Sequence, residues 1–132
     1  RPEEIGQHVY EETPFGYLQA AGRVLERACL DTDRGLVWSV LHQSDLDAAG
    51  IGLADTDPLI DLIRLPQEAG AALLLKQHGP NLYKGSLRSR GGIDVGRIAA
   101  ELGGGGHHNA AGFTFAGPPE EAVVAVQQLL DR

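Results

Sequence analysis

The chain has 132 residues, of which 42% are hydrophobic and 22% are charged, and its formal net charge at pH 7 is −7. This length and composition are typical of one globular domain. No apolar run approaches membrane-spanning length and no signal peptide opens the chain, so we expect a cytoplasmic protein with no membrane partner. The acidic balance disfavours non-specific binding of long nucleic acids, which requires an excess of lysine and arginine.

The start of the chain and its single cysteine give two further expectations. The chain begins at Arg1 and contains no methionine, which indicates a piece of a longer protein. Cys29 is the only cysteine, so it cannot form an internal disulfide. Its place in an amphipathic pattern favours a core position over a nucleophilic role.

Taken in order, the first third of the chain has helical periodicity. Residues Pro2 to Glu12 predict a short helix that Pro14 ends. From Phe15 to Cys29, apolar residues recur at helical spacing and predict an amphipathic helix that packs on the core. Turn-forming residues follow from Asp31 to Gly35.

The middle of the chain begins with an apolar, β-rich run. Residues Leu36 to Leu41 predict a strand buried on both faces. A helical turn is expected to follow and to end at Gly50, and a further helix is expected over Leu59 to Leu65. The residues expected to cap or begin these two helices are Ser44, Asp47, Thr56, Asp57 and Pro58.

Two strand-like runs then predict an antiparallel hairpin. Ala71 to Gln77 and Leu82 to Ser89 are separated by a turn cluster from His78 to Asn81. Side chains alternate between the two faces of a strand. The second strand therefore has one apolar face and one face of hydrogen-bond donors, the latter formed by Lys84, Ser86 and Arg88.

The last third predicts a helix, a strand and a helix. Asp94 is expected to cap a helix that runs to Leu102, a strand is expected from Gly112 to Ala116, and Glu120 is expected near the start of the last helix. This order of elements predicts an α/β (α+β) fold, with a mixed β-sheet of about four to five strands packed with helices.

The most unusual stretch is the run of four glycines from Gly103 to Gly106, followed by His107, His108 and Asn109. Without Cβ atoms, a backbone can adopt positive φ, aim successive N–H groups at one point and let a ligand approach closely. A phosphate or a nucleotide is the natural ligand for such a loop. Gly103 also has a simpler explanation, as the residue that ends the preceding helix. Asn109 either hydrogen-bonds a base edge or completes the turn.

Basic residues gather in the same part of the sequence. Between Lys76 and His108 there are five Lys or Arg and two Asp or Glu residues, a local charge of +3 in a chain of −7. Arg88 offers a planar fork that suits phosphate or carboxylate. A local positive region in an acidic chain suits a small anion better than a duplex.

Groups for catalysis are not evident. Zinc requires three or four ligands at suitable spacing, and His107 and His108 have no Cys, Asp or Glu close by in the sequence that would complete a set. No serine or cysteine has a recognisable base and orienting acid. We therefore expect no metal site and no catalytic residue in this chain.

These features together resemble a known family. The motif from Lys84 to Ser89, the helix from Val95 to Leu102 and the sequence GGGGHHNAAGF are similar to the DHH-associated C-terminal domain of the DHH phosphoesterases. The most similar branch comprises short-oligonucleotide exonucleases that also remove the 3′-phosphate from 3′-phosphoadenosine 5′-phosphate. Leu36 to Gly50 and the helix after Pro58 also lie where that branch has them.

The resemblance implies that residues 1–132 form one substrate-binding domain and that the N-terminal DHH domain is absent from this chain. In that family the N-terminal domain, with its Asp-His-His triplet, holds manganese that activates water against the scissile phosphate. The C-terminal domain closes over the cleft and grips the nucleotide. We therefore expect manganese only in the missing domain, no cofactor here, and no hydrolysis by this chain alone.

The resemblance also implies substrates, partners and site residues. The substrates are short oligonucleotides or a mononucleotide with 3′- and 5′-phosphates, and the partner is the chain's own N-terminal DHH domain, with a homodimer open for the full-length protein. Arg88 and His107 are implied to contact phosphate or base. The remaining residues of the implied substrate-binding set are Gly104, Gly105, Gly106, His108, Asn109 and Ser86.

Three alternatives stay open at this point. Related members act on cyclic dinucleotides or on longer single strands. The low aromatic content, 5% of the chain, disfavours long single strands, which usually need stacking side chains. The same associated domain also accompanies an aminoacylation enzyme as an RNA module. From a different class, the third alternative is a stand-alone nucleotide- or RNA-binding module.

Overall fold

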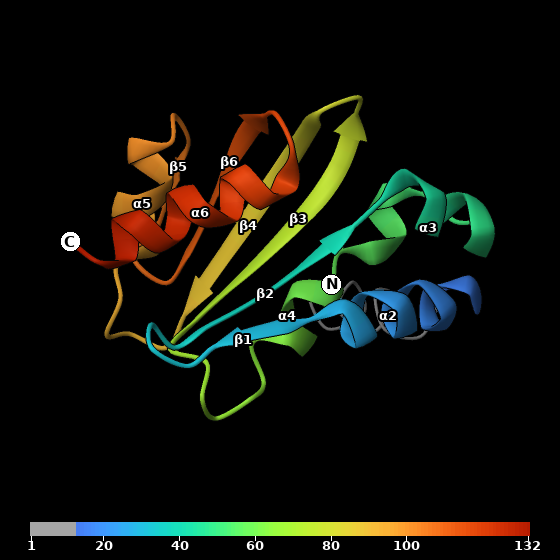
Figure 1. Ribbon diagram of the computed structural model, residues 1–132. Coiled ribbons are helices and arrows are strands. Elements are labelled where there is room, and N and C mark those ends of the chain that lie inside the picture. Colours follow the sequence, from blue (N-terminus) through green and yellow to red (C-terminus); the bar gives the residue numbers. More distant parts are fainter. Residues whose placement is uncertain (1–12) are drawn as a thin grey trace, which may run out of the picture.

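Figure 1 shows the protein as a computed structural model, which describes residues 13–132. The helix predicted for Pro2 to Glu12 lies outside the described residues. No helix within residues 13–132 is both long and apolar enough to cross a lipid bilayer.

Within the described residues, the strands form one mixed sheet in the order β1-β2-β3-β4-β6-β5. Only β2 and β3 pair in parallel, and the other neighbours pair antiparallel. The predicted class, an α+β fold with a mixed sheet and packed helices, is confirmed, although the sheet has six strands where four to five were expected. The strands are β1 (Cys29–Asp31), β2 (Leu36–Leu41), β3 (Ala71–Gly79), β4 (Leu82–Ser89), β5 (Gly105–Gly106) and β6 (Ala110–Ala116).

Helices cover both sides of this sheet, but unequally. Figure 1 shows α5 and α6 on one side, here termed the first side, and α2, α3 and α4 on the second side. The helices are α2 (Gly16–Arg27), α3 (Gln43–Ala49), α4 (Leu59–Ile63), α5 (Val95–Glu101) and α6 (Pro119–Leu130), with the 3-10 helix η1 (Leu53–Thr56) before α4.

Each side of the sheet buries its own core. On the first side, Leu73 and Leu87 of the sheet pack with Ile98 of α5 and Val126 of α6. On the second side, the sheet residues of the core come from β2 and β3, and no residue of β4, β5 or β6 belongs to that core, although α4 also contacts β4. The sequence of β2, apolar except for Ser39, and the alternating sequence of β4 explain this difference. The strand and helix residues of the second core include Val24, Val37, Leu41, Ile60, Ile63, Ala72 and Leu74.

Several local predictions are confirmed. The predicted hairpin is formed by β3 and β4, although β3 continues through His78 to Gly79. Asp94 caps α5, because its carboxylate accepts the Arg97 N–H at 3.1 Å. Gly103 has φ +86° directly after that helix, as expected for the residue that ends it.

The prediction for Cys29 is wrong. α2 ends at Arg27, and Ala28 is extended with φ −61° and ψ 141°. Cys29 therefore lies in the edge strand β1, where its side chain is exposed. Apolar residues continue past the end of the helix, because the short strand β1 also carries an apolar side chain, Leu30. The pattern of apolar residues therefore did not show where the helix ends.

The predicted caps of the two middle helices are also wrong. α3 begins at Gln43, and Asp45 caps it by accepting the His42 N–H at 2.8 Å. The pair Ser44 and Asp47 misplaced the cap by two residues from His42, because both patterns place an acid three residues after a candidate cap.

At α4, Pro58 is the N-cap residue, and neither Thr56 nor Asp57 caps the helix. The Thr56 hydroxyl donates to the Leu53 carbonyl at 2.6 Å, within η1. The helix itself spans Leu59–Ile63, two residues shorter than predicted.

Candidate functional site

On the second side, α4 contacts β4, but no residue of β4, β6 or β5 is buried in the core beneath the helices, and this part of the sheet forms the open face. On β4 this face presents Lys84, Ser86 and Arg88, which are exposed or half-buried, whereas Tyr83 and Leu87 point into the first core. Residues directly opposite each other on antiparallel strands project to the same side. The partners on β6 are Thr114, Gly112 and Ala110, respectively.

The edge strand β5 pairs with β6 and adds further residues to this face, beside those of β6. Gly105 pairs with Gly112. His107 and Ala110 exchange backbone hydrogen bonds of 2.7 and 3.3 Å, which places His107 opposite Ala110 at the end of the β5–β6 hairpin. Because Ala110 is also opposite Arg88, its small side chain lies between His107 and Arg88 on the open face.

The two rows bring together four of the residues predicted for the site. One row contains Arg88 and His107 on either side of Ala110, and the next contains Ser86 and Gly105 on either side of Gly112. The middle positions carry a methyl group and a hydrogen atom. The open face therefore has a shallow floor with polar groups on both sides of it.

The structure explains three of the four glycines without a ligand. Gly103 has positive φ. A Cβ atom on Gly104 would overlap the Gly112 carbonyl oxygen and lie 2.7 Å from the Phe113 Cα. Gly106 has φ +147°, and a Cβ atom there would lie 2.5 Å from the Ala111 Cα.

Gly105 is the exception among these glycines. A Cβ atom on it would meet nothing within 4 Å, and its φ is not positive. Packing within residues 13–132 therefore gives no reason for a glycine at this position of the open face. A glycine here leaves the backbone of the open face accessible from outside.

Backbone donors of the glycine stretch are partly used within the fold. The Gly104 N–H donates to the Ala99 carbonyl at 2.8 Å, and the Gly103 N–H donates to the Ala100 carbonyl at 3.1 Å. Gly105 and Gly106 pair with β6. The expected concavity of free N–H groups is thus replaced by a hairpin. The Gly104 N–H is used within the fold, and the absence of a side chain at Gly104 allows β6 to pack closely against it.

His108 and Asn109 form the turn of this hairpin. The His108 Nε2 lies 2.8 Å from the Gly91 carbonyl oxygen, and its Nδ1 lies 3.8 Å from the Asp94 carboxylate. The Asn109 carbonyl accepts the Ser89 N–H at 3.0 Å. These contacts attach the hairpin to the end of β4 and to the segment before α5. Asn109 lies in the turn, and binding of a base edge by its side chain stays a prediction.

Arg88 has no acidic partner among the described residues. Its Nη1 donates to the Leu87 carbonyl at 2.9 Å, and no ion pair involves its guanidinium. Several other arginines pair with acids, as Arg27 does with Asp45 at 2.7 Å, whereas Arg90 and Arg97 donate to backbone carbonyls. The remaining donors of Arg88 are therefore available to an anion.

Sequence reasoning counted Lys76 in the basic region but did not include it among the site residues. Lys76 on β3 lies directly opposite Lys84, at the border of the open face. The pKa of Lys76 is lowered, mainly by burial. Asp57 acts in the opposite direction, and the charge of Arg88 lowers the pKa further, so Lys76 and Arg88 act on each other. The alternation of β3 contained the signal, but the register that brings Lys76 beside Lys84 could not be known.

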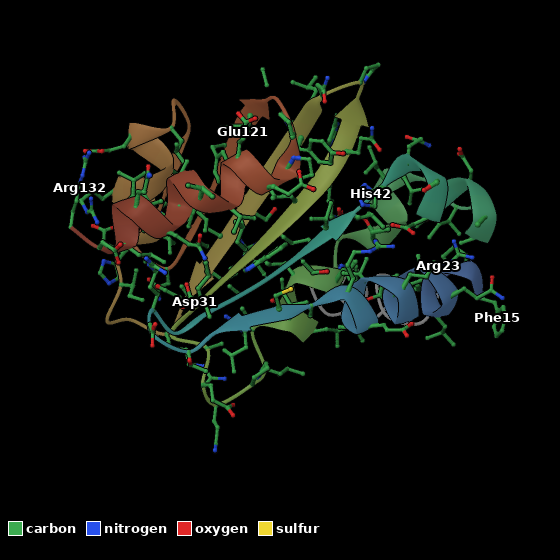
Figure 2. The ribbon with its side chains drawn as sticks, in the orientation of Figure 1. Phe15, Arg23, Asp31, His42, Glu121 and Arg132 are labelled. Atoms are coloured by element: carbon green, nitrogen blue, oxygen red, sulfur yellow. The ribbon has the colours of Figure 1, made fainter. Side chains whose placement is uncertain are left out.

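Two hollows differ in their chemistry. A groove of about 370 Å³ crosses the open face and is lined by Lys84, Ser86, Gly104 and Gly112, among others. A larger hollow of about 680 Å³ lies between α2 and α4 and is mainly apolar. Figure 2 places Phe15, which lines the larger hollow, at the outer end of α2 and far from the β4–β6 half of the sheet.

The open face suits an anion and not a manganese ion. Within residues 13–132, no three His, Cys, Asp or Glu side chains come close enough together to share a metal ion. Mn²⁺ prefers carboxylate, imidazole and water ligands. The open face instead carries Arg88 and Lys84, which repel cations.

Comparison with known proteins agrees with the sequence motif. The chain is 41% identical over 124 residues to the bifunctional oligoribonuclease and PAP phosphatase NrnA of Thermus thermophilus, covering 90% of this chain and 36% of the relative. An exopolyphosphatase-related protein from Bacteroides fragilis superposes with a TM-score of 0.86 at 27% identity, covering 99% of this chain and 38% of that protein. This chain therefore spans little more than a third of either relative.

Two more distant structures share the fold. The pGpG-specific phosphodiesterase PggH from Vibrio cholerae has a TM-score of 0.57 at 14% identity, covering 94% of this chain and 40% of that protein. The C-Ala domain of Aquifex aeolicus alanyl-tRNA synthetase has a TM-score of 0.52 at 16% identity, covering 73% and 87%. The model of the DHHA1 domain family matches residues 46–132, which contain the whole open face. This chain belongs to the DHHA1 domain family, the DHH-associated domain that its glycine motif resembles.

Proposed function

We propose that this chain is the substrate-binding domain of a manganese-dependent phosphoesterase that hydrolyses short oligonucleotides, 3′-phosphoadenosine 5′-phosphate, or both. The observation that carries the proposal is the row of Arg88 and His107 on either side of Ala110, on an open sheet face without an acid. The Thermus relative, whose name gives both activities, supports this choice of substrates.

Arg88 and His107 bind the phosphate in this proposal. The guanidinium fork matches two oxygens of a phosphate group, and an imidazole donates a further hydrogen bond. Ser86 supplies a hydroxyl in the next row, and Gly105 allows the nucleotide to approach the backbone. These groups orient the nucleotide and form no bond with it.

Hydrolysis belongs to the N-terminal DHH domain in the same proposal. Manganese held there supplies the activated water, and this chain binds no metal and hydrolyses nothing alone. The intact protein is proposed to be cytoplasmic, with the two domains closing on one nucleotide and with a homodimer as its assembly.

A titration tests the binding role. We expect a 5′-phosphorylated dinucleotide to shift the amide NMR signals of Arg88 and of Gly104 to Asn109 with saturation. The affinity should be on the order of high micromolar to millimolar, because a few charge-assisted hydrogen bonds must offset the entropy of association. Arg88→Ala should abolish saturation.

The matched control is Arg23→Ala, on α2 and far from the open face (Figure 2). It removes the same charge and should leave the titration unchanged. Silence of the unmodified chain up to millimolar ligand, or equal binding by Arg88→Ala, contradicts the proposal. Manganese-dependent hydrolysis by this chain that His107→Ala abolishes would also contradict it.

A further inference from the structure

The residue after His107 attaches the β5–β6 hairpin to the segment that joins β4 to α5. The His108 Nε2 lies 2.8 Å from the Gly91 carbonyl oxygen, and its Nδ1 lies 3.8 Å from the Asp94 carboxylate. The His108 carbonyl also accepts the Val95 N–H at 2.9 Å. One residue of the hairpin thus contacts three residues between the end of β4 and the first turn of α5.

The segment around Gly91 is exposed and has few neighbours. Gly91 has φ +114°, and a Cβ atom on either Gly91 or Gly92 would meet nothing within 4 Å. Among the described residues, the His108 imidazole is the side chain that bonds to the Gly91 carbonyl. Because Gly91 lies three residues after Arg88, this contact links the strand that carries Arg88 to the hairpin that carries His107.

The hairpin and the start of α5 lie in close contact. A Cβ atom on Gly96 would lie 2.9 Å from the His107 carbonyl oxygen, so glycine at this position lets the helix approach the hairpin backbone. The Ser89 hydroxyl donates to the Ile93 carbonyl at 2.7 Å and lies 3.4 Å from the His108 carbonyl oxygen. A displacement of the segment before α5 is therefore transmitted to the backbone of His107.

The two ring nitrogens of His108 both face acceptors. A neutral imidazole has one N–H and one acceptor nitrogen, whereas an imidazolium has two N–H donors. At 2.8 Å from a carbonyl oxygen, Nε2 is the donor, so in the neutral ring an unprotonated Nδ1 faces the Asp94 carboxylate. Protonation makes Nδ1 a donor and adds attraction to Asp94. The protonated ring therefore holds the segment more firmly than the neutral ring.

Asp94 is the one acid within 4 Å of this ring among the described residues, and its carboxylate also accepts the Arg97 N–H at 3.1 Å. Other charged or titratable groups lie on the surrounding elements: Arg88 and Arg90 at the end of β4, Arg97 on α5, His107 on the hairpin, and Asp33, Arg34 and Asp131 across the polar hollow beside Asp94. Arg34 pairs with Asp131 at 2.9 Å, and Arg90 and Arg97 donate to backbone carbonyls. The Asp94 carboxylate is therefore the group that distinguishes the two charge states of His108.

We propose that His108 is a positioning residue of the nucleotide site and that its protonation strengthens nucleotide binding. Protonated His108 holds the hairpin against the segment after β4 and so keeps His107 opposite Arg88 across Ala110. The inference rests on the proposed function and adds a regulation of that site by pH. His108 itself does not contact the nucleotide.

A ratio of affinities at two pH values tests this role. The ligand is the 5′-phosphorylated dinucleotide, and His108→Gln replaces the ring by an amide that can donate to Gly91 but carries no charge. The unmodified chain should bind about two to five times more tightly than His108→Gln at pH 5.5 and equally tightly at pH 8, because histidine ordinarily changes charge between these values. The ring and Asp94 are about half exposed, which keeps the expected effect small. Titration of the ligand phosphate and of His107 affects both proteins alike and cancels in the ratio.

Asp94→Asn provides a second variant. Asparagine also caps helices, so it keeps an acceptor for the Arg97 N–H and removes only the charge that faces His108. It should weaken binding at the lower pH by about the same factor, and it should leave the affinity of His108→Gln unchanged. Additive effects of the two substitutions, or a ratio for His108→Gln that is equal at both pH values, overturn the positioning role.

The matched control is His78→Gln. His78 lies near the β3–β4 turn, at the opposite end of β4 from Arg88, and the substitution removes a titratable ring there. The affinity ratio for this variant should stay near one at both pH values. A pH-dependent ratio as large as that of His108→Gln would also overturn the inference.

Failure of the proposed function has a different signature. If the unmodified chain binds no dinucleotide at millimolar concentration, or if Arg88→Ala binds it equally well, the nucleotide site and its positioning residue are both wrong. If Arg88→Ala weakens binding while the ratio for His108→Gln does not change with pH, only the positioning role is wrong.

Discussion

The second side of the sheet has a covered half over β2 and β3 and an open half over β4, β6 and β5. In the covered half, Val37 and Leu74 lie beneath helices and the polar groups there are paired internally. In the open half, Arg88 and Lys84 have no acidic partner among the described residues. The same sheet thus uses one half for stability and leaves the other half open, where we propose that the nucleotide binds.

The largest expected effect comes from the covered half. Asp45→Ala should lower the free energy of unfolding by about 3 kcal/mol, because Arg27 loses its paired carboxylate and the His42 N–H loses its acceptor. Urea unfolding measures this change. Asp47→Ala, on the exposed side of α3, should change stability by less than about 0.5 kcal/mol. Equal losses for the two variants would contradict the internal pairing.

The second effect separates two neighbouring glycines of the open half. Gly104→Ala should cost about 1–3 kcal/mol of stability, because the new methyl group overlaps the backbone of Gly112 and Phe113. Gly105→Ala meets open space, so its stability should change by less than about 0.5 kcal/mol while nucleotide affinity falls. Thermal unfolding and the dinucleotide titration together test both. Unchanged nucleotide affinity in Gly105→Ala would contradict the proposal that the nucleotide approaches the backbone at Gly105.

Acid provides a smaller perturbation of the covered half. Burial raises the pKa of Asp45, but hydrogen bonds from Arg27 and His42 outweigh it and hold the net pKa below its usual value. A depressed carboxyl pKa stabilises the protein above the unfolded-state pKa of about 3.9 and loses that contribution as pH falls through the folded-state pKa.

Urea midpoints between pH 6 and pH 3 measure this loss. Asp31 and Asp131, which share Arg34, also have lowered pKa values and contribute in the same direction. Asp45→Asn should therefore reduce the slope of stability with pH without abolishing it. An unchanged slope in that variant would exclude Asp45 as a source of the loss of stability in acid.

The smallest expected effect is a gain of stability, and it comes from a substitution at the border of the open half. Lys76→Met should raise the free energy of unfolding by about 0.2–1 kcal/mol, because it removes one of two like charges on opposite strands and a partly buried ammonium. Urea unfolding at low salt gives the measurement. A loss of stability would mean that the hydrogen bond to Thr56 outweighs the repulsion.

The alternation of β4 was enough to predict that Ser86 and Arg88 share a face, because a strand period of two needs no tertiary information. The alignment of His107 with Arg88 was not predictable, since it depends on Ala110 pairing with both. The register of Lys76 and Lys84 is likewise set by the irregularity between Gln77 and Gly79.

The glycines also show that close contacts between distant parts of the chain could not be predicted from the sequence. Gly103 was explained from its place after a helix, which is local information. The reasons for Gly104 and Gly106 lie in contacts with β6, and a sequence does not reveal these close approaches. β1 was missed because three residues are too few to establish a period.

Cys29 has a practical consequence for studying this protein. Its exposed thiol lies on β1, at one edge of the sheet, and β5 lies at the other edge, about 24 Å away across five strand spacings. A fluorophore attached by maleimide chemistry would occupy one defined site without any substitution. Energy transfer from that dye to a labelled oligonucleotide would report binding and the polarity of the bound strand together.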